Sequence, residues 1–251
     1  MKRFENRTVL VTGAGSGMGR AVALRLAEEG AAVALWGRRV ALLDRVADEI
    51  AAAGGRALAQ GCDIASPGDI AGNLEALIAE FGALHAVFAN AGHLGDFKPL
   101  RETGPADFDA LIRINMLGTQ QTIAQSLPRM AGGAVLVNAS WTVGAVMPGA
   151  GAYAASKAAL TAMMRTWAVE EGPRGNRINA ISPGIILTRM ADDALDPAIS
   201  ARLADHTPLR RNGRSEDVAG TAAWLLSEDA AFVTGQDIIV DGGFTLGGAL
   251  R

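Results

Sequence analysis

The sequence alternates short, β-branched apolar runs with longer stretches of helical spacing over its whole length. Runs typical of buried strands occupy 8–12, 31–36, 57–63, 85–90, 134–140, 177–182 and 237–243. Helical patterns lie between them, at 17–29, 38–53, 67–81, 105–130, 152–171 and 215–227. Such alternation joins parallel strands by crossover connections. We therefore expect an α/β fold, a doubly wound parallel sheet of about seven strands with helices on both faces, whose ligand binds beyond the carboxyl ends of the strands.

The bulk properties fit one folded domain and exclude several classes of protein. The chain has 251 residues, 49% of them hydrophobic and 20% charged, with a net charge of −3. Its densest basic stretch, Arg210 to Arg214, is too short to indicate a nucleic-acid partner. Cys62 is the single cysteine and the three histidines lack ligand spacing, so we expect neither a disulfide nor a metal site. The sequence has no signal peptide and no membrane-spanning run, which predicts a cytoplasmic protein with no membrane partner.

A glycine-rich segment, TGAGSGMG, begins at Thr12, where the first expected strand passes into a helix. Glycines at 13, 17 and 19 permit a tight turn and a close approach of the backbone to a diphosphate. The following helix presents free N–H groups and the positive end of its dipole to the phosphates. The lysine of a nucleoside-triphosphate loop is missing, so this segment favours a dinucleotide.

The only tyrosine of the chain, Tyr153, stands four residues before Lys157, one of three lysines. Positions four apart share one face of a helix, so the phenol and the ammonium are expected side by side. Taken alone, the pair is equally compatible with an ordinary helix surface. The surrounding motifs decide its interpretation.

Six motifs follow one another in a recognisable order: TGAGSGMG, NAG from Asn90, Asn115 within INMLG, Ser140, YAASK from Tyr153, and SPGIILT from Ser182. Together they resemble the short-chain dehydrogenase/reductase family, and the similarity extends to VTGQDIIVDGG near the C-terminus. The resemblance implies a single-domain Rossmann fold over 1–251, a homotetramer and oxidoreductase chemistry. In SWTVG the glycine comes one residue later than in the family's usual Ser-x-x-Gly, so the loop after Ser140 is expected to differ.

The resemblance implies four catalytic residues. Tyr153 would exchange a proton with the substrate oxygen, and Ser140 would hydrogen-bond that oxygen as negative charge develops. Lys157 would hold the cofactor ribose and lower the tyrosine pKa from about 10, a shift of about 3 units requiring roughly 4 kcal/mol. Asn115 would hold a water that connects Lys157 to solvent. Its other interpretation is a polar residue at a helix kink.

The family pattern also assigns a cofactor site: Gly13, Ser16, Gly17, Met18, Gly19, Arg38, Arg39, Asp63, Ile64, Asn90, Ala91, Gly92, Tyr153, Lys157, Pro183, Gly184, Ile186 and Thr188. Asp63 resembles the adenine-binding aspartate, with a turn or helix cap as its alternative. At the end of the second strand Gly37 replaces the acidic residue common in NAD-dependent members, and Arg38 and Arg39 follow it. A guanidinium grips a phosphate through two hydrogen bonds, so we expect NADP(H) to be preferred over NAD(H).

The function expected is reversible hydride transfer between NADP(H) and a small-molecule carbonyl or secondary alcohol. A 3-oxoacyl-thioester reductase would use the same catalytic residues, and a non-catalytic dinucleotide-binding redox sensor is the alternative of another class. Trp141, Met147, Ile185 and Met190 are candidate substrate contacts, with ordinary packing as the alternative for each. The segment 188–210 is expected to be a substrate-binding lid.

Overall fold

Seven parallel strands form the central sheet of the computed structural model, which describes residues 2–188 and 196–247. Each hydrogen-bonded pair of neighbours is parallel. The strand order is β3 (Arg56–Gly61), β2 (Ala32–Gly37), β1 (Thr8–Thr12), β4 (Ala86–Ala89), β5 (Ala134–Asn138), β6 (Arg177–Pro183) and β9 (Asp237–Val240). The order reverses between β1 and β4, and ligands of such sheets bind at this switch.

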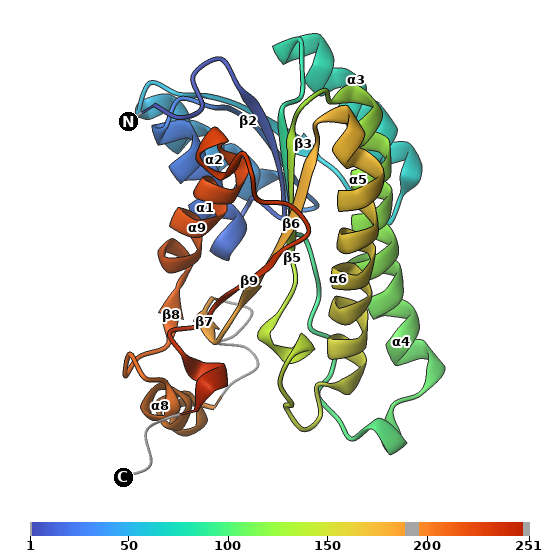
Figure 1. Ribbon diagram of the computed structural model, residues 1–251, viewed down its shortest axis with the longest axis vertical. Helices are drawn as coiled ribbons and strands as arrows, with labels where there is room; N and C mark the ends of the chain where they lie inside the picture. Colours follow the sequence, from blue (N-terminus) through green and yellow to red (C-terminus); the bar gives the residue numbers. More distant parts are fainter. Residues whose placement is uncertain (1, 189–195, 248–251) are drawn as a thin grey trace.

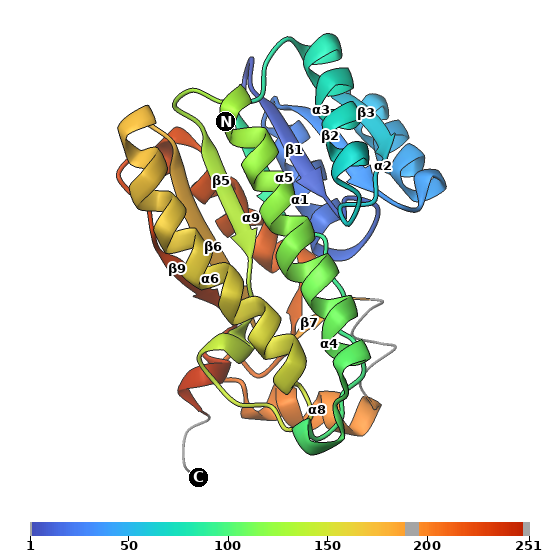
Figure 2. The same cartoon turned by 90° about the vertical axis from the view of Figure 1, so that its right-hand side faces the viewer.

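Helices cover both faces of the sheet and enclose two apolar cores (Figure 1). One face carries α1 (Gly17–Glu28), α2 (Val40–Ala52) and α9 (Ser215–Leu226). The other carries α3 (Pro67–Phe81), α4 (Pro105–Leu111), α5 (Thr119–Ser126) and α6 (Gly151–Glu171). In Figure 2, α4 leads into α5 along one line, with α6 on one side and α3 on the other. The doubly wound sheet predicted from strand–helix alternation is therefore confirmed.

The central strands are apolar because side chains on both of their faces are buried. Every residue of β1, β4 and β5 is buried, as expected for strands covered by helices on both sides. Several strands end earlier than the apolar runs suggest: β3 ends at Gly61, β5 at Asn138 and β9 at Val240. The residues directly after β3, Cys62 to Ile64, line the cavity described below.

The single helix expected over 105–130 is the clearest difference from the sequence-based assignment. The structure has α4, a π-helical segment over Ile112–Gly118, α5 and a 3₁₀ turn over Leu127–Arg129. Gly118 lies so close to Ile64 that a Cβ there would meet the Ile64 carbonyl oxygen at 2.9 Å. The wide π turn brings Asn115 fully into the interior, and such turns recur at functional sites.

Smaller elements lie beyond the carboxyl ends of the strands. The strand β7 (Ile186–Leu187) pairs with β8 (Gly213–Arg214), and α8 (Pro197–His206) lies below them in Figure 1. Asp196 caps α8 by accepting a hydrogen bond from Ala198 N at 2.8 Å. The helix α8 belongs to the segment 188–210 predicted as a lid. Residues 189–195 of that segment, Met190 among them, lie outside the described residues.

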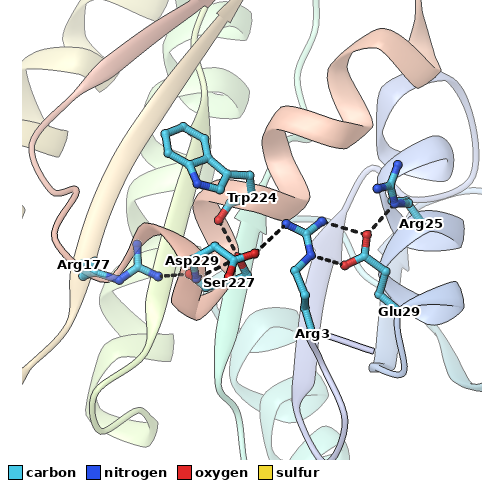
Figure 3. A network of polar contacts seen from close by, with 7 residues as sticks. All are labelled: Arg3, Arg25, Glu29, Arg177, Trp224, Ser227 and Asp229. Atoms are coloured by element: carbon cyan, nitrogen blue, oxygen red, sulfur yellow. Dashed lines mark hydrogen bonds and ion pairs between the residues drawn. The ribbon is translucent and has the colours of Figure 1, made fainter. Parts of the chain in front are cut away.

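Ion pairs and hydrogen bonds close the opposite end of the sheet (Figure 3). Arg3 Nε contacts Glu29 Oε2 at 2.6 Å, and Arg3 Nη1 contacts Asp229 Oδ2 at 3.3 Å. Arg177, the first residue of β6, donates to the carbonyl oxygen of Ser227 at 2.9 Å. These contacts tie the N-terminal segment to the ends of α1 and α9. No helix among residues 2–188 and 196–247 is long and apolar enough to cross a membrane.

Candidate active site

A cavity of about 500 Å³ opens at the switch between β1 and β4, a volume within the usual range of ligand sites. The predicted site residues that line it are Gly13, Ser16, Gly17, Met18, Arg38, Arg39, Asp63, Ile64, Asn90, Ala91, Gly92, Tyr153, Lys157 and Thr188. Sequence reasoning missed Gly15, Trp36, Leu43, Cys62, His93, Ile114 and Asn138, which also line it. A polar residue ending the apolar run AVLVN was the available signal for Asn138.

The glycine turn has the geometry of a phosphate cradle. Gly13 and Gly17 have φ of 66° and 54°, in the left-handed region that favours glycine. A Cβ on Gly19 would lie 2.3 Å from the Gly13 carbonyl oxygen, so this position also excludes a side chain. Ser16 stands at the N-cap of α1, and its hydroxyl accepts a hydrogen bond from Arg39 at 3.1 Å. The start of α1 thus lines the cavity with a glycine-rich turn, where the first N–H groups of a helix have no intrahelical partner, which fits a dinucleotide diphosphate.

A chain of hydrogen bonds joins the carboxyl ends of β1, β4 and β5 at the floor of the cavity. Thr12 Oγ1 accepts from the backbone N–H groups of Asn90 and Ala91, each at 2.9 Å. Asn90 Nδ2 donates to the Thr12 carbonyl at 2.9 Å, and Asn138 Nδ2 donates to Asn90 Oδ1 at 2.9 Å. Asn138 Oδ1 is buried with no partner in the part of the chain that the structure describes. This amide oxygen can therefore accept a hydrogen bond from a molecule bound at the floor of the cavity.

Helix α6 presents Tyr153 and Lys157 to the cavity from consecutive turns. Lys157 is only 3% exposed, and its Nζ donates to the Asn138 carbonyl oxygen at 2.7 Å. The same Nζ lies 5.8 Å from the centroid of the Tyr153 ring. Burial lowers the pKa of Lys157 to about 8, because the charged form loses its hydration.

The pKa of Tyr153 differs in direction from the sequence-based expectation. Burial of the phenol raises its pKa to about 12, and a hydrogen bond with Ser140 opposes the rise. The predicted lowering by Lys157 does not arise from the protein chain alone, because the ammonium is itself desolvated and points to the Asn138 carbonyl. Without a bound dinucleotide, burial therefore favours the neutral form of the Tyr153 phenol.

Ser140 lies two residues after the end of β5 and is 5% exposed. It caps the 3₁₀ turn Trp141–Val143, in which its Oγ accepts from Thr142 N at 3.2 Å and from Thr142 Oγ1 at 2.9 Å. The glycine that comes one residue later than in the family pattern, Gly144, directly follows this 3₁₀ turn, and Ser140 caps the start of the turn. Sequence reasoning did not single out Thr142.

The Asn115 amide bridges two segments. Its Nδ2 donates to the His93 carbonyl at 2.8 Å and to Ser156 Oγ at 3.0 Å, and its Oδ1 accepts from His93 N at 2.7 Å. Ser156 Oγ in turn donates to the Tyr153 carbonyl at 2.7 Å. Asn115 therefore joins the loop after β4 to the turn of α6 that carries Tyr153. Its place in the π-helical segment Ile112–Gly118 agrees with the interpretation as a kink residue, and the predicted role of holding a water stays a prediction.

The opposite end of the cavity is basic. Arg38 and Arg39 are exposed and line it next to Gly37. A Cβ on Gly37 would make only ordinary contacts, the nearest being Leu43 Cδ2 at 3.5 Å. Asp63 forms a local turn, in which its Oδ1 accepts from Ala65 N at 3.0 Å, and it also borders the cavity.

Several predicted residues support the cavity without lining it. Gly184 follows β6 and packs on Asp241 so closely that a Cβ would meet the Asp241 Cβ at 2.6 Å. The remaining ones are Gly19, Asn115, Ser140, Pro183 and Ile186. Of the candidate substrate contacts, Met147 and Ile185 do not border the cavity, and Trp141 is buried edge-on against Phe244 with ring centroids 4.9 Å apart.

Comparison with known proteins matches residues 13–245 to a family model described as enoyl-(acyl carrier protein) reductase. Cyclohexanol dehydrogenase of Acinetobacter sp. (strain SE19) is 35% identical over 246 residues, covering 97% of this chain and 96% of that protein. The chain belongs to the short-chain dehydrogenase/reductase family. As a member of that family it is an oxidoreductase that binds a nicotinamide dinucleotide.

Solved structures of short-chain dehydrogenases superpose closely on the whole chain. A 7α-hydroxysteroid dehydrogenase complexed with NADH and 7-oxo glycochenodeoxycholic acid has a TM-score of 0.93 at 32% identity, covering 96% of this chain and 95% of that one. A short-chain dehydrogenase from Burkholderia cenocepacia J2315 in complex with NADP has a TM-score of 0.91 at 29% identity, covering 97% and 99%. The family predicted from the motifs is confirmed.

Proposed function

We propose that this protein catalyses reversible hydride transfer between NADP(H) and a small-molecule carbonyl or secondary alcohol. The observation that carries the proposal is that Tyr153 and Lys157 line one end of the cavity while the buried Ser140 hydrogen-bonds to Tyr153. The glycine cradle lies at the floor of the same cavity. A dinucleotide-binding redox sensor without catalytic activity does not need Tyr153, Ser140 and Lys157 together.

The side chains would divide the proton chemistry among them. The neutral phenol of Tyr153 donates the proton that a carbonyl oxygen requires on reduction, and Ser140 hydrogen-bonds that oxygen as it gains charge. Lys157 contributes a positive charge beside the phenol and a donor for a ribose hydroxyl. The bound nicotinamide supplies the hydride. Asn115 is proposed to hold a relay water through the second lone pair of Oδ1 or its backbone carbonyl, because its other polar atoms are already hydrogen-bonded.

The preference for NADP(H) rests on the basic end of the cavity. Gly37 offers no acceptor to the ribose hydroxyls and no repulsion to a 2′-phosphate, while the exposed Arg38 and Arg39 supply guanidinium groups. Arg39 is partly engaged with Ser16, so Arg38 is the better placed of the two. We expect a preference worth about 1–3 kcal/mol, the value of a charge-assisted hydrogen bond.

Specificity constants for NADPH and NADH, measured with one substrate, test this preference. The double variant Gly37→Asp, Arg38→Ala should reverse it, and Gly37 has room for the new carboxylate. Arg38→Ala alone should lose the preference without gaining activity with NADH. Equal constants for the two dinucleotides in the unmodified protein would exclude the assignment.

A substrate panel tests the reaction itself. Cyclohexanone and cyclohexanol, glucose, a 7-oxo bile acid and acetoacetyl-CoA represent the ring ketones, sugars, steroids and acyl thioesters to be compared, with turnover followed by NADPH absorbance. The highest rate is expected with a ketone or secondary alcohol. Preferential reduction of acetoacetyl-CoA would favour the 3-oxoacyl-thioester reductase. Dinucleotide binding without turnover of any compound would favour the redox sensor.

A further inference from the structure

The hydroxyl of Thr142 contacts the proposed catalytic serine directly. Thr142 is 8% exposed and lies two residues after Ser140, inside the turn Trp141–Val143. Two of its groups reach the same atom: the backbone N lies 3.2 Å and Oγ1 lies 2.9 Å from Ser140 Oγ. One residue thus provides two hydrogen bonds to one hydroxyl oxygen.

A serine hydroxyl has one hydrogen to donate and two lone pairs that accept. The backbone N–H of Thr142 can only donate, so it occupies one lone pair. The Thr142 hydroxyl donates to the same oxygen at 2.9 Å, so it occupies the second lone pair. With both lone pairs occupied, the one hydrogen of Ser140 is left for an acceptor on its other side, where Ser140 neighbours Tyr153 and opposes the rise of its pKa.

We propose that Thr142 is a positioning residue that makes Ser140 an obligate hydrogen-bond donor toward the reacting oxygen. The proposal rests on the assignment of Ser140 and Tyr153 under the proposed function. A hydroxyl free to rotate would also accept a hydrogen bond from the phenol or from an alcohol substrate. Saturating its lone pairs removes those arrangements and leaves its hydrogen aimed at the oxygen that becomes negative.

The turn that carries Thr142 is held from outside by the C-terminal segment. Trp141 packs edge-on against Phe244, with ring centroids 4.9 Å apart. Phe244 lies in a turn fixed by Asp241, whose carboxylate accepts from Gly243 N at 2.8 Å and from Thr245 N at 2.7 Å. Ala139, just before Ser140, is anchored to the Ile181 carbonyl at 2.8 Å. An aromatic contact on one side and a backbone hydrogen bond on the other therefore hold the turn in which Thr142 reaches Ser140.

The variants Thr142→Val and Thr142→Ser separate the hydroxyl from the shape of the side chain. Valine keeps the branched shape and removes the donor, while serine keeps the donor. Thr161→Val is the matched control: Thr161 is also buried, and its hydroxyl donates to the Ala158 carbonyl at 2.9 Å within α6. With the best substrate of the panel, Thr142→Val should lower kcat about 10- to 100-fold with little change in KM for the dinucleotide. Thr142→Ser should stay within about threefold of the unmodified protein.

A second readout does not depend on turnover. Tyr153 is the only tyrosine, so tyrosine labelled with 13C at Cζ gives a single resonance that reports the ionisation of this phenol. In the NADP⁺-saturated protein, Thr142→Val should raise the midpoint of that ionisation by about 0.5–1 pH unit, because a freely rotating Ser140 stabilises the phenolate less. The other titratable groups lining this end of the cavity, His93 and Lys157, are the same in every variant.

The outcomes separate this inference from the proposed function. A raised midpoint in Thr142→Val but not in Thr142→Ser or Thr161→Val supports the role of Thr142, even if every compound of the panel fails as a substrate. An unchanged midpoint and unchanged kcat in Thr142→Val would overturn it. Equal losses in Thr142→Val and Thr142→Ser would also overturn it, because they would show that the side-chain shape matters and the hydroxyl does not. Thermal unfolding of each variant verifies that the compared proteins are folded.

Discussion

At the scale of single residues, burial moves the two titratable groups of the site in opposite directions. The pKa of Tyr153 rises to about 12 and that of Lys157 falls to about 8, and each shift favours the neutral form. Lys157 is charged in the unfolded chain below a pKa of about 10.4. Folding at neutral pH therefore buries a charge whose only protein acceptor shown is the Asn138 carbonyl.

Replacing Lys157 with Met should stabilise the dinucleotide-free protein at pH 7 by about 1–3 kcal/mol, because a desolvated charge is removed from the interior. The pKa of Lys157 is lower in the folded than in the unfolded protein. The free-energy cost of burying its charge is therefore absent above the unfolded pKa and grows as the pH falls toward about 8. Measured by urea unfolding, the increase in the free energy of unfolding caused by Lys157→Met should therefore reach its maximum at pH 7 and disappear above about pH 10.5. Activity should be lost at every pH. An equally stable or less stable variant at pH 7 would contradict the account.

Replacing Tyr153 with Phe should lower kcat by at least about 100-fold, because the proton donor is lost while the ring remains. Dinucleotide affinity, measured by fluorescence titration with NADPH, should change little. Lys157→Ala is the comparison, since it should weaken both turnover and dinucleotide binding. Retention of most of the activity in Tyr153→Phe would exclude the mechanism.

At the scale of elements, two glycines within helices have opposite surroundings. Gly19 lies in the first turn of α1, where a Cβ would meet the Gly13 carbonyl at 2.3 Å and Asn90 Nδ2 at 2.7 Å. Gly72 lies in the middle of α3 and has nothing within 4 Å of the same position. Of these two glycines, only Gly19 lies where the backbone of Gly13 comes too close for a side chain.

Gly19→Ala should destabilise the protein by about 1–3 kcal/mol through overpacking, and it should weaken dinucleotide binding by displacing the cradle. Gly72→Ala should instead stabilise it by about 0.5–1 kcal/mol, because alanine loses less backbone entropy in a helix. Thermal unfolding and NADPH titration of the two variants measure both effects. Similar changes in unfolding temperature and in NADPH affinity in the two variants would mean that the cradle does not need a glycine at position 19.

At the scale of the whole molecule, β9 is an edge strand with apolar side chains around it. Phe232 is fully exposed, Val169 is 78% exposed and Ile239 is 53% exposed. Gly235, two residues before β9, lies beside the end of α6, where a Cβ on Gly235 would contact Ala168 at 3.6 Å. An uncovered edge strand beside exposed apolar groups favours association with another copy of the chain.

Together with the homotetramer that the family resemblance implies, this edge leads us to expect a homotetramer with paired two-fold axes, so light scattering at micromolar protein should give about four times the chain mass of 25.9 kDa. Phe232→Asp should reduce that mass, because it places a charge in the proposed contact. Val40→Asp is the control, as Val40 is 45% exposed on α2 near the opposite edge of the sheet. A monomer mass in the unmodified protein would exclude this assembly.

Periodicity and spacing were sufficient to predict the seven-stranded sheet, the glycine cradle and the shared helix face of Tyr153 and Lys157. These features depend on backbone geometry over a few residues, which the sequence displays directly. The same reasoning expected one helix over 105–130. The structure instead has a π turn at Asn115, which ends at Gly118, where the chain packs closely against Ile64 from a distant segment.

The amino-acid sequence by itself determined the order of the elements and the residue types of the candidate site. Only the tertiary structure decided how those residues bond: the chain from Thr12 through Asn90 to Asn138 crosses three strands that meet only in the folded sheet. It also decided the direction of the Tyr153 pKa, since desolvation depends on all the segments that surround the phenol. For Thr142, too, the sequence gives the residue type and the tertiary structure decides its contact. Its hydroxyl acts on Ser140 because the loop closes into a helical turn there, held by aromatic contacts with the distant C-terminal segment.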